Sequence, residues 1–281
     1  NTLTGNSGND IITGGAGIDT ISDGAGNDIV DAAAGNDIIT MGAGTDSITA
    51  GSGNDAITAG TNLTSADTLA AGTGTDTLTI NAATVDADFT NVTGVETLTM
   101  NDTGTYTLGA LAQAAGITTV KAGVDNTVYT LAASTYTVGL TVNLTLSDTS
   151  TVDTITTGSG NDTFVYDGSG GLDDEDAITA GAGTDTIQLD NSVANVAVEY
   201  DNDDHSGIES ITVKDANGAA TGSATSVTVV LSADASTAAN TLIIDASNIT
   251  DSLDDVTVTN NASSSLTSYT ISGGAGDDIL A

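Results

Sequence analysis

Aspartates recur every nine residues along the first part of the chain. They stand at Asp10, Asp19, Asp28, Asp37, Asp46 and Asp55. Each closes a glycine-rich stretch and is followed two positions later by a bulky apolar residue, as in GGAGIDTIS at residues 14–22. Carboxylates and backbone carbonyls are the oxygen ligands that hard cations such as Ca²⁺ prefer. We interpret the row as metal ligands, because a solvated acidic face has no reason to keep a strict period of nine.

Each nonapeptide is expected to contain a tight turn followed by a short strand. The glycines allow the positive φ angles that tight turns need. The last four residues alternate polar and apolar side chains, which is typical of a strand with one face buried. Two nonapeptides would then form one coil, with coils stacked ~4.8 Å apart. The sequence predicts an all-β fold, a right-handed parallel β-roll that continues into parallel β-solenoid segments.

Alternate aspartates would stack on opposite edges of this roll. Neighbouring carboxylates ~4.8 Å apart repel by roughly 3.5 kcal/mol at an effective dielectric constant of ~20. One buried Ile per nonapeptide contributes ~1.5–3 kcal/mol, whereas ordering nine residues costs ~9 kcal/mol or more of backbone entropy. A cation between successive coils would resolve the conflict. Ca²⁺ accepts six to eight oxygens in irregular geometry, whereas Mg²⁺ demands a stricter octahedron, and Zn²⁺ is disfavoured without cysteine.

The predicted ligands are one carboxylate and two backbone carbonyls per nonapeptide. The carboxylates are those of Asp10, Asp19, Asp28, Asp37, Asp46, Asp55, Asp76, Asp162, Asp176, Asp185 and Asp278. The carbonyls belong to the first and third positions, namely Gly5, Ser7, Gly14, Ala16, Asp23, Ala25, Ala32, Ala34, Met41, Ala43, Ala50 and Ser52.

The pattern GGxGxDxUx, with U a bulky apolar residue, resembles the RTX (repeats-in-toxin) calcium-binding β-roll family. It covers residues 5–79, 157–188 and 273–281. Where Asp23, Ala32, Ala33 and Met41 replace glycines, the resemblance implies weaker turns more than lost ligands, since these positions would use their carbonyls. The unit at 59–70 is three residues longer, and we expect it to break the stack before Asp76. Asp278 is expected to lack a stacking partner.

Composition limits the partners and the chemistry. The chain has 281 residues with 38 acids, two lysines and no arginine, a net charge of −36. Nucleic acid is excluded as a partner because phosphate binding needs Lys and Arg. No apolar run approaches the ~20 residues of a membrane span, so we expect no membrane insertion. There is no cysteine, hence no disulfide or thiolate chemistry.

The repeats divide the chain into five predicted segments. They are an RTX β-roll at 1–79, a β-solenoid segment at 80–156, a second RTX block at 157–190, a second solenoid segment at 191–270 and the start of a further RTX block at 271–281. Residues 72–102 parallel residues 181–215, which indicates two tandem modules. Glu96 and Glu209 take equivalent places, which suggests a structural or calcium role for both. Residues 109–115 are a short helix candidate that Gly116 would end.

Catalysis is not expected. His205 is the only histidine, and no serine or cysteine stands with it in a nucleophile motif. No paired acid and base with a substrate pocket is evident from the sequence. We therefore predict that the protein is not an enzyme.

The long Thr- and Ala-rich β stretches between RTX blocks resemble those of Caulobacter-type surface-layer (S-layer) proteins. This resemblance implies type I secretion to the bacterial cell surface, calcium-triggered folding outside the cell and self-association into a two-dimensional lattice. A cell-surface polysaccharide is a further candidate partner. Two alternatives remain: a fragment of a secreted RTX adhesin, or the C-terminal calcium-binding domain of a secreted RTX hydrolase, which usually has one compact roll.

Overall fold

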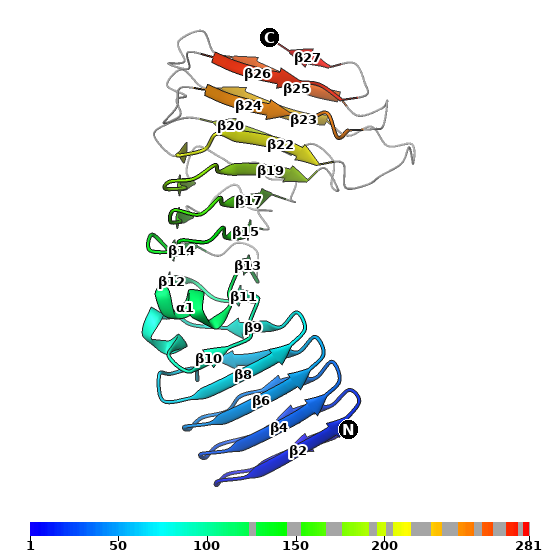
Figure 1. Cartoon of the computed structure of the whole chain (residues 1–281), viewed down its shortest axis with the longest axis vertical. Helices are drawn as coiled ribbons and strands as arrows, with labels where there is room; N and C mark the ends of the chain where they lie inside the picture. Colours follow the sequence, from blue (N-terminus) through cyan, green and yellow to red (C-terminus); the bar gives the residue numbers. More distant parts are fainter. Residues whose placement is uncertain are drawn as a thin grey trace. The chain divides into compact units, whose positions relative to one another are not determined.

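The protein is an all-β parallel solenoid, as the sequence predicts (Figure 1). The computed structural model describes residues 1–123, 128–144, 153–166, 176–190, 196–200, 205–214, 226–231, 241–249, 255–260, 268–274 and 278–280. The chain divides into two compact units, Asn1–Val124 and Asp125–Ala281. The five segments predicted from the repeats remain predictions.

The first unit has two parallel sheets, and consecutive strands of the chain alternate between them. One sheet orders β1 (Thr2–Thr4), β3 (Thr20–Ser22), β5 (Ile38–Thr40), β7 (Ala56–Gly60), β9 (Thr77–Ile80), β11 (Thr97–Met100) and β13 (Thr119–Ala122). The other orders β2 (Ile11–Ala16), β4 (Ile29–Ala34), β6 (Ser47–Ser52), β8 (Thr68–Thr73) and β10 (Val92–Thr93). Ile12 pairs with Val30, eighteen residues on, so one coil is two nonapeptides. Figure 1 shows β2, β4, β6 and β8 as successive rungs.

Two inward columns of side chains fill the space between these sheets. The first is the apolar residue two places after each aspartate, at most 1 % exposed in Ile21, Val30, Ile39, Ile48, Ile57, Leu69 and Leu78. The second, which the sequence reasoning missed, is the first position of the nonapeptide. It buries Ala32, Met41, Ala50, Ala59 and Ala71. From Ala32 onward each nonapeptide therefore buries two apolar side chains in the core, where the sequence predicted one.

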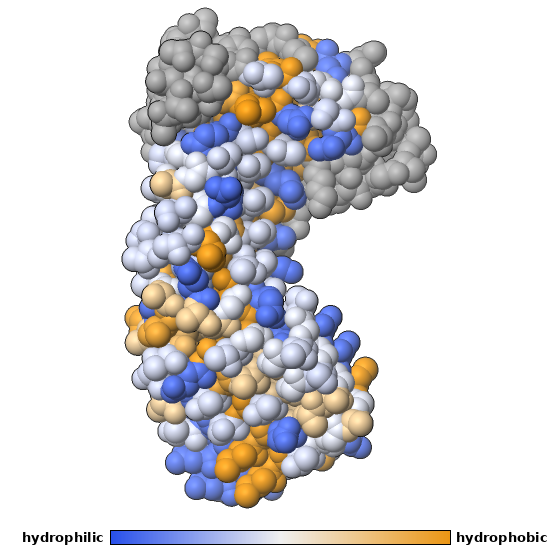
Figure 2. Space-filling view, in the orientation of Figure 1, coloured by the Kyte–Doolittle hydropathy of each residue, from blue (hydrophilic) through white to orange (hydrophobic). Residues whose placement is uncertain are grey.

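The residue directly after the aspartate points outward. Ile11 and Ile29 are neighbours across β2 and β4, and they are 80 % and 52 % exposed. Figure 2 shows hydrophobic surface at this end of the first unit. This outward direction follows from the two-residue period of a strand, which sends adjacent side chains to opposite faces.

The solenoid continues beyond the nonapeptides. β11 pairs in register with β9, and β13 pairs with β11. The same coils carry a 3-10 helix, η1 (Asp86–Phe89), the strand β12 (Gly104–Thr107) and the helix α1 (Ala110–Ala115). Gly116 ends α1 with φ 107°, as predicted. The Asp86 carboxylate accepts bonds from the N–H groups of Gly109 and Ala112 at 2.7 and 2.9 Å, which satisfies donors at the start of the helix.

The second unit has the same parallel architecture in its described parts. One row orders β15 (Thr141–Leu144), β17 (Thr163–Tyr166), β19 (Thr186–Asp190), β22 (Ser210–Lys214), β24 (Thr241–Asp245) and β26 (Ser268–Ser272). Another orders β14 (Tyr129–Ala132), β16 (Thr154–Thr156), β18 (Ala177–Thr179) and β21 (His205–Ser206). A third orders β20 (Val196–Tyr200), β23 (Ser226–Leu231), β25 (Asp255–Asn260) and β27 (Ile279–Leu280).

Glycine is favoured at the second position of the nonapeptide for two separate reasons, a positive φ angle and close contact with the neighbouring coil. Gly51 has φ 114°, and a Cβ there would lie 1.9 Å from the carbonyl oxygen of Ala33 in the neighbouring coil. Gly15 has φ 106° but nothing within 4 Å of its Cβ position. Ala33 itself occupies the equivalent position at φ 76°, so a side chain is tolerated when the neighbouring coil leaves room.

We expect Gly51→Ala to lower the melting temperature of the calcium-loaded protein much more than Gly15→Ala. Both variants carry backbone strain of about 1–2 kcal/mol, but only Gly51→Ala also forces two coils apart. Thermal unfolding followed by circular dichroism measures the difference. Equal losses would mean that backbone conformation alone requires glycine here.

Candidate metal centre

The aspartates form two ladders on opposite edges of the first unit. On one edge the Oδ1 atoms of Asp28, Asp46 and Asp67 accept bonds of 2.8–2.9 Å from the backbone N–H of the preceding aspartate in the row, which begins at Asp10. On the other edge Asp37, Asp55 and Asp76 accept equivalent bonds of 2.7 Å in a row that begins at Asp19. The alternation between edges is the one expected from the period of nine.

In six of the eight ladder aspartates the second carboxylate oxygen is buried and has no hydrogen-bond partner. This holds for Oδ2 of Asp19, Asp28, Asp37, Asp46, Asp55 and Asp76, all at most 2 % exposed. It also holds for Asp23 in the first unit and Asp185 in the second. A buried ionised oxygen without a partner is costly. A row of such oxygens fits a cation between coils, where each carboxylate would supply the ligand that the backbone does not use.

Burial raises the pKa values of six aspartate carboxyl groups in these stacks. The pKa rises at Asp46, Asp55, Asp76 and Asp162, and it reaches about 6 at Asp23 and Asp185. Loss of water around the charged form is the main cause, and neighbouring carboxylates, such as Glu209 beside Asp185, add to it. Without a cation these six groups therefore take up a proton more readily than an exposed aspartate does.

First-position carbonyls converge with ladder carboxylate oxygens, namely Oδ2 of Asp10, which accepts an N–H bond of 3.0 Å from Asn6, and the unpartnered Oδ2 of Asp19. A Cβ built on Gly5 would lie 1.8 Å from the carbonyl oxygen of Asp23 and 2.9 Å from Oδ2 of Asp10. On the other edge, a Cβ on Gly14 would lie 2.8 Å from the carbonyl oxygen of Ala32 and 2.6 Å from Oδ2 of Asp19. One small volume is thus shared by a carboxylate and a carbonyl of the next coil. That donor set fits Ca²⁺.

Third-position carbonyls already accept a backbone hydrogen bond. Those of Ala25, Ala34, Ala43 and Ser52 accept N–H bonds of 2.6–2.8 Å from glycines of the preceding coil. A carbonyl oxygen has two lone pairs, so one remains for a cation. Among the predicted carbonyl donors, Gly5, Asp23, Ala32, Met41 and Ala50 are buried, Gly14 and Ala34 are half-buried, and Ser7, Ala16, Ala25, Ala43 and Ser52 are exposed.

The longer unit at 59–70 does not break the stack, which corrects the expectation from its length. Asp46 and Asp55 donate to Asp67 and Asp76 as in a regular coil, because the extra residues leave the coil in a turn before Asp67. Inside this turn the backbone N–H and Oγ1 of Thr64 donate to Oδ2 of Asp67 at 2.8 and 2.9 Å. The Asn62 amide donates to the Met41 carbonyl at 3.1 Å. At Asp67, therefore, Thr64 donates hydrogen bonds to the carboxylate oxygen that is left free for a cation in Asp28 and Asp46 on the same edge.

Glutamates extend the ladders where the nonapeptides stop. Oε2 of Glu96 accepts from the N–H of Asp76, and Oε2 of Glu209 accepts from Asp185, both at 2.8 Å. The sequence indicated this shared structural role, because the two glutamates take equivalent places in the two modules.

In the second unit the predicted aspartates stack on neighbouring coils. Asp162 accepts from Leu140 and Asp185 from Asp162, both at 2.7 Å. Asp176 accepts from Asp153 at 3.0 Å. The sequence reasoning missed Asp153 and did not place Asp67 in the row, although each stands nine residues before a predicted ligand.

Asp278 has a neighbour in the preceding coil, contrary to expectation. Its Oδ1 accepts from the N–H of Val256 at 3.2 Å. The side chain is half-buried, unlike the aspartates in the middle of the ladders. It is therefore attached to the stack but less shielded from water.

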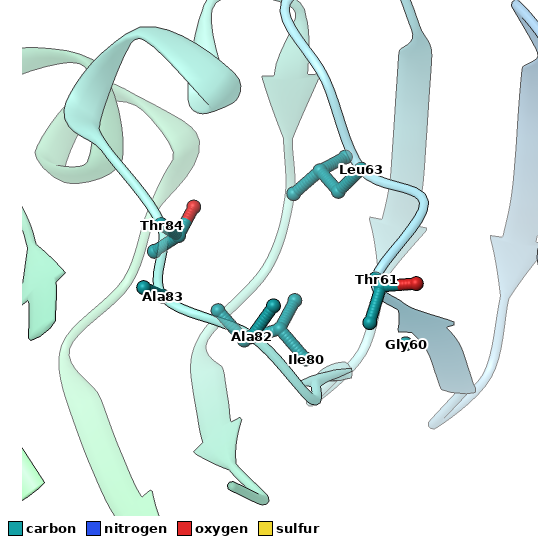
Figure 3. A pocket seen from close by; sticks show the side chains of 7 residues that line it. All are labelled: Gly60, Thr61, Leu63, Ile80, Ala82, Ala83 and Thr84. Atoms are coloured by element: carbon teal, nitrogen blue, oxygen red, sulfur yellow. The ribbon is translucent and has the colours of Figure 1, made fainter. Parts of the chain in front are cut away.

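A shallow pocket lies beside the longer unit (Figure 3). Its lining consists of Gly60, Thr61, Leu63, Ile80, Ala82, Ala83 and Thr84. None of these residues has a titratable side chain; the polar side chains of the lining are the hydroxyls of Thr61 and Thr84.

Four stretches of the chain match the model of the RTX calcium-binding nonapeptide repeat: residues 4–39, 42–62, 145–168 and 270–281. The chain contains RTX calcium-binding repeats. These RTX repeats imply Ca²⁺ binding and are typical of secreted proteins. Comparisons with curated proteins and with solved structures give no match. Within the described residues, no helix has the length and apolar character needed to cross a membrane.

The RTX repeats should respond to pH in opposite ways with and without calcium. Asp23 and Asp185 have pKa values of about 6 in the folded protein against an ordinary 3.8. The folded state therefore binds protons more readily than the unfolded state, and stability without calcium should fall as pH rises from about 4 to about 6. With calcium, protons compete for the same oxygens, so more calcium should be needed at pH 5 than at pH 7.5.

Circular dichroism of calcium-free protein at pH 7.5 and pH 5, with calcium titrations at both, measures these responses. We expect more β structure at pH 5 before calcium is added. A calcium midpoint that is the same at both pH values would contradict proton competition at the carboxylates.

Proposed function

We propose that this chain is a structural component of a bacterial S-layer, which folds and assembles into a two-dimensional cell-surface lattice when it meets external calcium. The observation that carries the proposal is the unbroken stacking of RTX and non-RTX coils in the first unit, from β1 to β13. Such a solenoid is a rigid spacer with long lateral faces. Those faces suit a lattice building block better than an appendage of a catalytic domain.

The mechanism is linkage between calcium binding and folding. A cation that binds the folded coils and not the unfolded chain stabilises the fold by RT ln(1 + [Ca²⁺]/Kd) per site. The low calcium of the cytosol would leave the chain extended and suited to type I secretion. High external calcium would then fold it at the cell surface, where lateral contacts and a cell-surface polysaccharide would hold it.

The same repeats also serve a secreted RTX adhesin or the calcium domain of a secreted hydrolase. The sequence is predicted to alternate RTX blocks with Thr- and Ala-rich solenoid segments, and the parallel between residues 72–102 and 181–215 indicates two tandem modules. That alternation favours an extended scaffold over a single roll attached to an enzyme. We accordingly propose a non-catalytic role.

Electron microscopy of the purified chain with and without millimolar calcium tests the lattice. We expect ordered sheets in calcium and dispersed chains after chelation. Dispersed folded monomers that bind cells or glycans would favour the adhesin instead. Hydrolysis by the parent protein, abolished by chelation, would favour the hydrolase.

A further inference from the structure

Asp23 lies in a column of side chains that is otherwise free of charge. The first position of the nonapeptide points into the core, where Ala32, Met41 and Ala50 are at most 2 % exposed. Asp23 occupies this inward position and is 0 % exposed. A carboxylate placed among apolar side chains is costly unless a partner stabilises its charge.

Two carboxylates of the ladder share the surroundings of Asp23. Asp23, Asp28 and Asp46 each present an oxygen, and these three oxygens lie within 4.8 Å of one another. All three residues are buried, and Oδ2 of each has no hydrogen-bond partner. In the part of the chain that the structure describes, no lysine pairs with them. Three buried negative charges thus converge without a counter-charge from the protein.

The opposite edge of the roll provides an internal comparison. There Asp37 and Asp55 stack in the same way, but the first positions of their nonapeptides are Ala32 and Ala50. A cation between those coils would meet two carboxylates, whereas one between the coils of Asp28 and Asp46 would meet three. The number of charged ligands is a main determinant of the calcium affinity of a site.

We propose that the Asp23 carboxylate completes a three-carboxylate site with Asp28 and Asp46, and that this site holds its calcium ion more tightly than the other sites of the roll. The proposal rests on calcium binding by the RTX repeats, and it assigns to Asp23 a ligand role that its backbone carbonyl alone would not provide. Asp23 then determines which calcium site is occupied first as the calcium concentration rises.

If Asp23 had only a structural role, its side chain would need to accept a hydrogen bond but would not need a charge. Its Oδ1 accepts a bond of 2.6 Å from the N–H of Gly42 in the next coil. An asparagine would accept that bond equally well through its amide oxygen. Asp23→Asn therefore preserves the link between coils and removes only the charge, whereas Asp23→Gly removes both.

The experiment is equilibrium dialysis of the 281-residue chain against buffers of defined free calcium, with bound calcium counted by atomic emission. The variants are Asp23→Asn and Asp23→Gly. The control is Asp31→Asn, which removes the same charge from the same nonapeptide at an exposed position. We expect the dissociation constant of the tightest ion to rise about tenfold or more in both Asp23 variants and to stay unchanged in the control.

Each other outcome is decisive. If Asp23→Asn binds like the wild type and only Asp23→Gly is weakened, Asp23 acts through Gly42 and the proposal is overturned. If both Asp23 variants keep the tightest ion, the third carboxylate is not a ligand, although the repeats still bind calcium. If the wild-type chain retains no calcium at millimolar concentration, the proposed function fails together with this site.

Discussion

Removing calcium should unfold the RTX coils of this protein. Each coil buries carboxylate oxygens that have no partner within the protein. Without cations, the stacked carboxylates of neighbouring coils therefore repel one another. A site saturated at about 100 times its Kd contributes about 2.7 kcal/mol. A few such sites match the whole stability of an ordinary domain, about 5–15 kcal/mol.

Far-ultraviolet circular dichroism in a chelator, followed by titration with calcium, measures this effect. We expect a largely disordered spectrum in the chelator and a β spectrum once calcium is restored. Magnesium at the same concentration is the control, and we expect it to restore less β structure because it accepts irregular oxygen sites poorly. Full β structure that persists in excess EDTA, after time for trapped calcium to leave, would refute calcium-dependent folding.

Asp37→Asn should be strongly destabilising, although it is a conservative change, because Asp37 lies inside the ladder that Asp19 begins. Asp37 is in the middle of its ladder, where Oδ1 accepts from the N–H of Asp19 and Oδ2 has no partner. Asparagine keeps the first bond and loses the charge on the second oxygen. We expect a loss of about 3 kcal/mol in calcium, within the range for removing one member of a buried charge pair.

Chemical denaturation in saturating calcium measures this loss of free energy. Asp31→Asn should stay within about 0.5 kcal/mol of the wild type, since Asp31 is exposed. A change at Asp278 should cost less than one at Asp37, because Asp278 is only half-buried. Equal calcium midpoints for the Asp37 and Asp278 variants would contradict a stack of shared sites.

The period of nine predicted the two ladders because it coincides with half a coil. Because Ile12 pairs with Val30, residues eighteen apart occupy the same position on neighbouring coils. Asp10 must therefore lie next to Asp28. The same reasoning failed to place Asp67 in the ladder. Counting residues does not reveal that the three inserted residues form a turn outside the regular coil. Only the nine-residue step from Asp67 to Asp76 carried that information.

Side-chain direction at the first position was harder to predict. Glycine and alanine are compatible with either side of a coil, so their occurrence at this position did not reveal a second inward column. Met41 was the clue, since a large apolar side chain there is best explained by burial. The motif suggested only a carbonyl role for Asp23, and the structure shows that its carboxylate is buried as well.

The backbone-to-carboxylate bonds join each coil only to its immediate neighbours, at the same position in each. An eighteen-residue segment such as residues 23–40 therefore makes the same kind of backbone-to-carboxylate bond to the coil before it and to the coil after it. Duplicating or deleting that segment should lengthen or shorten the roll by one layer and leave the remaining layers in register. We therefore expect the chain to tolerate changes of length by whole coils, because each added coil can make the same backbone-to-carboxylate bonds as the coils beside it.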